Sequence, residues 1–166
     1  DPDVVEESNL NRLPFSPGSV GREKVFILQE FILEIRPRAK VFGFPMRATK
    51  STVDSFRPDV LVDATDSIKS QVELSDACSE RGISYIRVGN DGQHIMLTDT
   101  VPKWNMKDDT RYTVNPSWVA PPALLAALAV ARIMALPDLE FTGEIAEIGG
   151  LSPKNRIRRL NAKLLS

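Results

Sequence analysis

The sequence DVLVDATDS (59–67) decides the fold that we expect for this chain. It places an unbroken apolar run, VLV, between acidic residues, as is typical of a parallel strand that is covered on both faces. A helical pattern follows over 67–81, with apolar residues along one side and Gly82 at its end. A strand that leads directly into a helix predicts an α/β fold with a mostly parallel sheet flanked by helices.

The rest of the sequence extends this pattern. The other elements that we expect are the end of a strand at 1–7, a helix from Arg22 that stops at Pro37, a strand at 39–44, a short helix or turn at 51–56 with Ser51 as its cap, strands at 83–89 and 94–99, an apolar helix from about Ala120, a strand within 140–149 and a basic helix within 152–165. The NDG sequence at 90–92 is a strong turn signal, so strands 83–89 and 94–99 should form an antiparallel hairpin. Residues 100–117 show little periodicity and indicate an irregular crossing segment.

Composition sets broad limits on the class of protein. A chain of 166 residues with 42% hydrophobic and 26% charged residues is typical of one soluble domain. A net charge of −1 gives no bulk attraction to nucleic acid or to a membrane surface. The single cysteine, Cys78, excludes an internal disulfide, and no CxxC pair is present to hold zinc. We therefore expect a cytoplasmic protein.

One apolar stretch has the length of a membrane span. It reads WVAPPALLAALAVARIMAL (118–136). Pro121 and Pro122 stand near its start, Arg132 near its end, and alanine, which favours insertion less than leucine does, is frequent. We interpret this stretch as a buried or subunit-interface helix and expect no membrane association.

Acidic residues stand where two of the expected strands end, and basic residues follow the first of them. In open α/β sheets, ligands bind at the carboxyl ends of the strands. A carboxylate there can bind ribose hydroxyls or hold Mg²⁺ through its oxygens, while arginine, lysine and asparagine can contact phosphate oxygens. Such a set suits a nucleoside triphosphate and its metal ion. The residues concerned are Asp1, Asp3, Asn9, Arg12, Lys24, Asp63 and Asp66.

Three strings, DPDVVEESNLNR (1–12), VGREK (20–24) and VLVDATD (60–66), together resemble the ThiF/MoeB family of adenylyltransferases, which includes the ubiquitin-activating enzymes. The resemblance implies one Rossmann-like domain over 1–166, with the nucleotide-binding part at 1–90. The crossing segment, the apolar interface helix and the C-terminal strand and helix fall at 91–166. It also implies that the family's first strand and glycine-rich loop precede Asp1 and are missing from this sequence.

The resemblance further implies roles for single residues, with ATP and Mg²⁺ as cofactors. The implied ribose-binding acid is Asp1, with Asp3 at the same strand end, the implied phosphate contacts are Asn9, Arg12 and Lys24, and the implied magnesium ligand is Asp66. Arg12, Lys24 and Asp66 are thereby the implied catalytic residues. We expect them to neutralise the charge that develops when a carboxylate attacks the α-phosphate.

The family's partners follow from the same resemblance. Members activate a ubiquitin-like protein tail, a peptide or a tRNA-linked group, and we expect a homodimer. No cysteine falls at 97–117, where many members place a nucleophile, and Cys78 lies on the apolar side of its expected helix, so we expect it to be buried. This pattern implies a member that hands its adenylated substrate directly to an acceptor.

Two other functions remain open at the level of sequence. One is a non-catalytic scaffold subunit of an activating-enzyme-like dimer, and the other is a dinucleotide-dependent oxidoreductase. Arg12, Lys24 and Asp66 argue against a scaffold subunit, because a non-catalytic subunit has no chemical need for them. The SNLNR sequence (8–12) argues against the second, because it has no role in hydride transfer.

Overall fold

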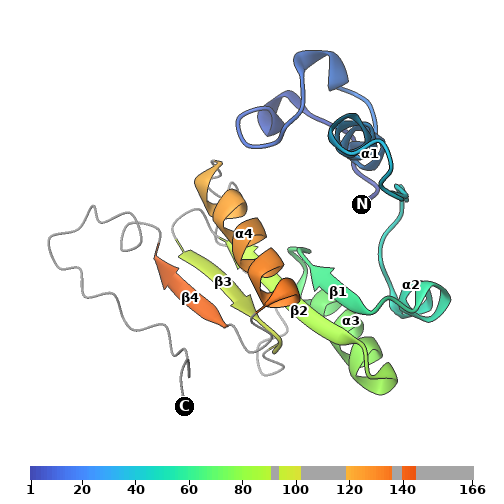
Figure 1. Cartoon of the computed structure of the whole chain (residues 1–166), viewed down its shortest axis with the longest axis vertical. Helices are drawn as coiled ribbons and strands as arrows, with labels where there is room; N and C mark the ends of the chain where they lie inside the picture. The colour runs from blue at the N-terminus through green and yellow to red at the C-terminus, as the bar shows by residue number, and fades with distance from the viewer. Residues whose placement is uncertain (91–93, 102–118, 136–139, 145–166) are drawn as a thin grey trace, which may run out of the picture. The chain divides into compact units, whose positions relative to one another are not determined.

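The computed structural model describes residues 1–90, 94–101, 119–135 and 140–144. It divides into two compact units, Asp1–Ala48 and Thr49–Ser166, and each is described here by itself. Figure 1 shows the elements of both. The turn at 91–93, nearly all of the expected crossing segment, the residues after Glu144 and the basic tail helix lie outside the described residues.

A four-stranded sheet forms the centre of the second unit. In spatial order its strands are β1 (Val60–Asp63), β2 (Ser84–Asn90), β3 (His94–Thr98) and β4 (Phe141–Glu144). β1 and β2 are parallel, whereas β2–β3 and β3–β4 are antiparallel. The α/β class and the antiparallel hairpin extension are therefore confirmed, and the expected strand within 140–149 is present as β4.

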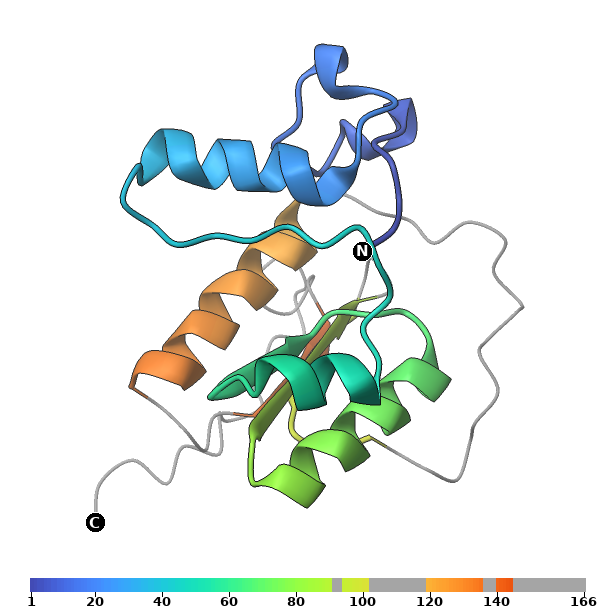
Figure 2. The same ribbon diagram turned by 90° about the vertical axis from the view of Figure 1, so that its right-hand side faces the viewer.

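Helices cover both faces of this sheet (Figures 1 and 2). These helices are α2 (Lys50–Phe56), α3 (Ile68–Arg81) and α4 (Ala120–Met134). On the face that carries α2 and α3, Leu74 and Cys78 pack with Val53 and Tyr85. The α4 face has a separate core, whose members are Ile86, Ile95, Leu97, Leu125 and Ala129. Alternation of side chains along β2 explains the division, since Tyr85 and Ile86 point to opposite faces.

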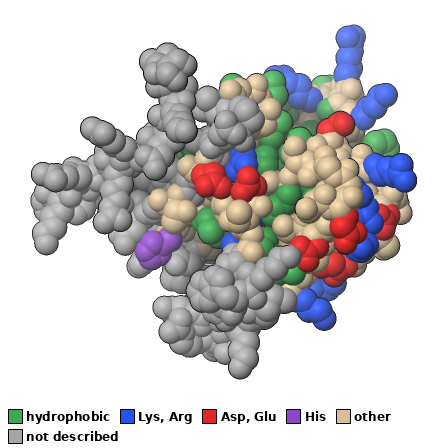
Figure 3. Space-filling view, turned by 90° about the horizontal axis from the view of Figure 1, so that it is seen from below, with side chains coloured by type: hydrophobic (Ala, Val, Ile, Leu, Met, Phe, Trp, Pro, Cys, Tyr) green, Lys and Arg blue, Asp and Glu red, His purple; other side chains and the backbone are tan. Residues whose placement is uncertain are grey.

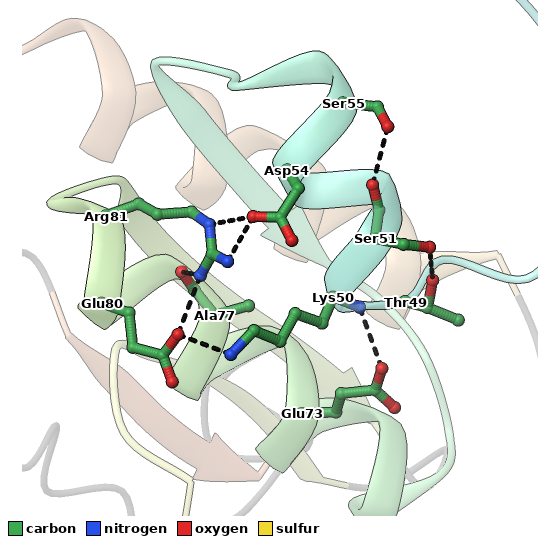
Figure 4. Close-up of polar contacts among 9 residues, drawn as sticks. All are labelled: Thr49, Lys50, Ser51, Asp54, Ser55, Glu73, Ala77, Glu80 and Arg81. Carbon is green, nitrogen blue, oxygen red and sulfur yellow. Dashed lines mark hydrogen bonds and ion pairs between the residues drawn. The ribbon is translucent and has the colours of Figure 1, made fainter.

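Charged side chains join α2 to α3 (Figure 4). The backbone N–H of Lys50 donates to Glu73 Oε1 at 2.9 Å, and Lys50 Nζ contacts Glu80 Oε2 at 2.6 Å. Arg81 bridges Asp54, Glu80 and the carbonyl oxygen of Ala77. Because these contacts are exposed, they orient α2 more than they stabilise it, and the buried Val53 supplies the apolar anchor.

The first unit is built around one helix. α1 (Lys24–Ile35) follows two short 3₁₀ turns, η1 (Glu7–Asn9) and η2 (Pro17–Ser19). The expected strand end at 1–7 is reduced to a single antiparallel bridge between Val4 and Glu23. Backbone hydrogen bonds from Lys24 N–H to the Asp3 oxygen (3.0 Å) and from Val5 N–H to the Arg22 oxygen (2.8 Å) tie this segment to the start of α1.

Two expectations about local structure are wrong. Residues 39–44 form no strand, although their sequence has strand propensity. The Gly43 N–H donates to Gln29 Oε1 on α1 at 2.9 Å, and the Phe42 side chain is 73% exposed. Strand propensity reflects fit to a neighbouring strand, and the described residues of this unit provide none. The cap of α2 is Thr49 rather than Ser51, because Thr49 and Thr52 form a capping box.

β1 is less covered than its apolar sequence predicts. Its hydrogen-bonded neighbour in the described sheet is β2 alone, and the Val62 side chain is 43% exposed.

α3 matches its prediction closely, since Ser67 is its N-cap and Gly82 its C-cap in the left-handed conformation (φ 65°). Within the described residues, no helix, α4 included, is long and apolar enough to cross a membrane.

Candidate functional site

The two acids at the carboxyl end of β1 have different surroundings. Asp63 is buried, with 2% of its surface exposed. Its Oδ2 accepts a hydrogen bond from the Tyr85 hydroxyl at 2.7 Å, and its Oδ1 accepts one from the Thr65 N–H at 2.9 Å. A carboxylate that is buried and already hydrogen-bonded on both oxygens is poorly placed to bind a ligand. Asp63 therefore belongs to the framework of the site.

Asp66 is the acid at this strand end that is available to a ligand. Its side chain is exposed, and no hydrogen bond or ion pair involves its carboxylate within the described part of the chain. It directly precedes Ser67, whose hydroxyl caps α3 by accepting the Ser70 N–H at 3.5 Å. β1 and the first turn of α3 thus present a free carboxylate at the edge of the sheet where α/β proteins bind ligands.

In the first unit, the structure brings Asp1, Asp3 and Lys24 together. Lys24 Nζ forms an ion pair with Asp3 Oδ2 at 3.0 Å, and the Asp1 carboxylate accepts the Asp3 N–H at 2.9 Å. The Lys24 side chain is 21% exposed and that of Asp3 is 65% exposed. Lys24 therefore lies against the protein with its charge directed to one carboxylate. Its point charge suits a phosphate oxygen equally well.

Asn9 and Arg12 lie one helical turn apart in the 3₁₀ region. Asn9 is buried, and its Oδ1 accepts the Glu6 N–H at 3.1 Å, so this amide closes the turn. Arg12 is half-buried, and its Nη1 donates to the Ser8 carbonyl oxygen (2.8 Å) and to Asn11 Oδ1 (3.0 Å). These contacts fix the guanidinium group, which has five N–H donors in all.

A divalent cation fits the donor chemistry at Asp66. Among the described residues, no group of three or more His, Cys, Asp or Glu side chains gathers as a metal site. Mg²⁺ is usually held by one or two carboxylates, with water and substrate phosphates completing its octahedral shell. One exposed carboxylate, without a partner in the described ranges, is consistent with that mode of binding.

A hollow lies at the opposite end of β1 from Asp66. It has a volume of about 440 Å³, and it is lined by Arg57, Pro58, Asp59, Arg81, Gly82 and Ile83. These residues precede β1 and β2 or end the helices before them, so the hollow is remote from Asp63 and Asp66.

On the face drawn in Figure 3, acidic and basic side chains are interspersed over the described residues, without a broad basic area.

Cys78 is fully buried on the core-facing side of α3, as its position on the helix predicts. Burial raises the pKa of its thiol, and the nearby Arg81 opposes that shift only in part. The thiolate, which is the nucleophilic form, is therefore disfavoured in the folded protein. The prediction of a buried structural cysteine is confirmed.

This burial predicts slow thiol chemistry. We expect a disulfide reagent such as DTNB to modify Cys78 at least ~100-fold more slowly in the folded protein than in urea, because a local opening of about 3 kcal/mol must come first. Absorbance of the released thiol measures both rates. Rapid modification of the native protein would show that α3 does not protect this residue.

Tyr85 and Gln71 are the site residues that the sequence does not indicate. Tyr85 looks like an ordinary strand residue, and Gln71 lies among ordinary polar helix residues. Their roles depend on tertiary register, because Tyr85 pairs with Leu61 on β1 and thereby brings its hydroxyl within 2.7 Å of Asp63. A tyrosine within a predicted strand is the one available signal, since a buried hydroxyl needs a partner.

Comparisons with known proteins agree with this geometry. The ThiF family profile matches residues 1–116. The adenylyltransferase and sulfurtransferase UBA4 of Eremothecium gossypii is 33% identical over 99 residues, which is 56% of this chain and 22% of UBA4. The tRNA threonylcarbamoyladenosine dehydratase of Bacillus subtilis is 32% identical over 90 residues, which is 52% of this chain and 35% of that protein. The chain thus spans about a third or less of the length of these relatives.

The same fold occurs in a solved structure of Escherichia coli MccB with AMPCPP and MccA. The TM-score is 0.68 at 18% identity, and the match covers 82% of this chain and 46% of MccB. Another MccB structure contains ATP. This likeness confirms the Rossmann-like α/β fold class.

Proposed function

This chain belongs to the ThiF family, and on that premise we propose that the full-length protein is an ATP- and Mg²⁺-dependent adenylyltransferase that activates a carboxylate. The observation that carries this proposal is the exposed carboxylate of Asp66 at the end of β1, which has no partner among the described residues and lies inside the segment that the family profile covers. The name of UBA4, an adenylyltransferase, supports the same reaction class.

In this proposal each candidate residue has a separate task. Asp66 holds Mg²⁺, which when bound supplies positive charge to the phosphates. Lys24 exchanges its ion pair with Asp3 for a phosphate oxygen, and Arg12 directs its guanidinium N–H groups to the phosphates. Asn9 supports the turn that presents Arg12, and its amide N–H would donate to the same phosphates. Asp1 and Asp3 accept hydrogen bonds from the ribose.

The reaction itself transfers the adenylyl group. An oxygen of the substrate carboxylate attacks the α-phosphorus, a new C–O–P linkage forms, and the bond between the α-phosphorus and the bridging oxygen breaks as pyrophosphate leaves. The protein's contribution is to hold the reactants in line and to oppose the negative charge on the phosphate oxygens. Arg12 and Lys24 perform the second task.

The acceptor in this proposal receives the activated group without a thioester on this chain. Cys78, the only cysteine in the sequence, is fully buried. The adenylated carboxylate of a ubiquitin-like protein tail, a peptide or a tRNA-linked group is then attacked directly by the nucleophile of the acceptor, and AMP leaves. One relative is named for a tRNA-linked group, the tRNA threonylcarbamoyladenosine dehydratase.

Exchange of labelled pyrophosphate into ATP tests this function. We expect the full-length protein to catalyse exchange when ATP, Mg²⁺ and a carboxylate substrate are all present, and to stop when EDTA removes the metal. Calorimetry with ATP and Mg²⁺ complements the assay. Binding without exchange across ubiquitin-like, peptide and tRNA substrates, or no binding at all, would instead favour the scaffold subunit.

We further propose that the protein forms a homodimer through α4. The outer face of this helix is apolar. Ala123, Ala126 and Ala127 are exposed in its first half, and Val130, Ile133 and Met134 are 58%, 45% and 78% exposed toward its end. An uninterrupted apolar stripe that faces solvent is typical of a surface that binds a partner.

A charge on that stripe should separate the subunits. We expect Val130→Glu to convert the dimer into a monomer in sedimentation-velocity experiments, because an unpaired carboxylate would be buried in the interface. Lys69→Glu, an exposed change on α3, is the matched control and should leave the dimer intact. A wild-type monomer, or a Val130→Glu dimer of unchanged affinity, would refute this interface.

A further inference from the structure

A buried polar network supports residues 64–67, which connect β1 to α3 and are called the Asp66 loop here. The Tyr85 hydroxyl donates to Asp63 Oδ2 at 2.7 Å and lies 3.4 Å from the Gln71 carbonyl oxygen. Gln71, which is 4% exposed, donates from Nε2 to the Thr65 carbonyl oxygen at 2.5 Å. β1, β2 and α3 each contribute one of these three side chains.

The network holds the Thr65 peptide from both sides. Asp63 Oδ1 accepts the Thr65 N–H, and Gln71 Nε2 donates to the Thr65 C=O. On the other side of Asp66, the Ser67 carbonyl oxygen accepts the Gln71 N–H at 3.0 Å and the Ser67 hydroxyl caps α3. Asp66 is therefore fixed between two anchored residues, while its own side chain is exposed and has no partner in the part of the chain that the structure describes.

Burial makes this network costly unless it is complete. A buried carboxylate without hydrogen-bond donors would be strongly destabilised, so Asp63 depends on the Tyr85 hydroxyl. Burial, together with the hydrogen bond to Asp63, raises the pKa of Tyr85 far above its usual value. The phenol consequently remains a hydrogen-bond donor throughout the physiological pH range.

We propose that Tyr85, with Asp63 and Gln71, is a positioning residue that fixes Asp66 in the geometry that binds Mg²⁺. This inference rests on the proposed function, because it assigns the metal to Asp66. A ligand held in advance loses less conformational freedom when the ion binds, and groups behind metal ligands commonly change metal affinity about 10–100-fold when they are removed. Tyr85 itself touches neither the metal nor the nucleotide.

Tyr85→Phe separates positioning from packing, since it keeps the ring in the core and removes only the donor. Leu74→Val is the matched control, because Leu74 packs in the same cluster but makes no contact with the Asp66 loop through a polar group. For Tyr85→Phe we expect the Mg²⁺ concentration at half-maximal pyrophosphate exchange to rise about 10-fold, with a smaller effect on the rate at saturating Mg²⁺. Leu74→Val should leave this concentration unchanged.

A second readout does not require activity. Hydrogen exchange of residues 64–67, followed by mass spectrometry, should be faster in Tyr85→Phe than in Leu74→Val, because the Thr65 N–H loses its fixed acceptor. Equal exchange in the two variants, or an equal shift in Mg²⁺ dependence, would overturn the positioning role. If the wild type shows no pyrophosphate exchange, the proposed function fails, whereas the hydrogen-exchange comparison still decides whether the network fixes this loop.

Discussion

Asp66→Asn is expected to lower the rate of pyrophosphate exchange by the full-length protein roughly 10²–10³-fold, the size of effect seen when one preorganised charge-stabilising group is removed. The variant keeps the shape of the side chain and removes the negative charge that would hold Mg²⁺. Because Asp66 is exposed and has no partner in the described residues, its replacement should leave the midpoint of urea unfolding unchanged. Exchange assays and unfolding curves on the same preparations measure both quantities.

Asp59→Asn is the matched control for that experiment. Asp59 is also exposed and immediately precedes β1, so it lies at the opposite end of the same strand and lines the remote hollow. We expect its exchange rate to stay close to that of the wild type. Equal exchange rates in the two variants would show that Asp66 has no role in the reaction. A large loss of rate in Asp59→Asn would indicate that the reaction takes place at the opposite end of β1, beside Asp59.

Leu97→Ala is expected to have the largest effect on stability. Leu97 is fully buried in the core between the sheet and α4, where it belongs to the cluster that contains Ile86, Ile95 and Leu125. Removal of its side-chain atoms should reduce the free energy of unfolding by about 2–5 kcal/mol, which combines lost transfer free energy with the cost of a cavity. Urea unfolding followed by circular dichroism measures this change.

The neighbouring Leu128 provides the comparison for Leu97. It packs on the same cluster but is only partly buried, so Leu128→Ala should cost clearly less. If the two variants were equally stable, or if Leu97→Ala cost less than about 1 kcal/mol, the core described between α4 and the sheet would be incorrect.

Local sequence patterns are sufficient to predict those helices and strands whose apolar periodicity and end residues are clear. β1 follows from the apolar run before Asp63, and α3 follows from its period together with Ser67 and Gly82 at its ends. The segment 39–44 shows the limit of this approach. Its valine and phenylalanines favour a strand, yet a strand also requires a partner for its backbone N–H and C=O groups, and partner choice depends on distant parts of the chain.

The candidate site shows the same limit in its chemistry. Sequence reasoning found Asp63 and Asp66 together, but residue type and spacing cannot separate a buried acid from an exposed one three positions away. The register of β1 against β2 makes that distinction, because it places Tyr85 beside Asp63. The pairing of Lys24 with Asp3, 21 residues apart, likewise depends on how α1 returns to the start of the chain.

A crystal structure of the full-length protein with ATP and Mg²⁺ would test most directly the claim that Asp66 binds the metal of the nucleotide complex. We predict an Asp66 carboxylate oxygen about 2.0–2.1 Å from the ion, or one bridging water away, with Arg12 and Lys24 on phosphate oxygens. A metal held entirely by other groups, with Asp66 still free in solvent, would contradict the account.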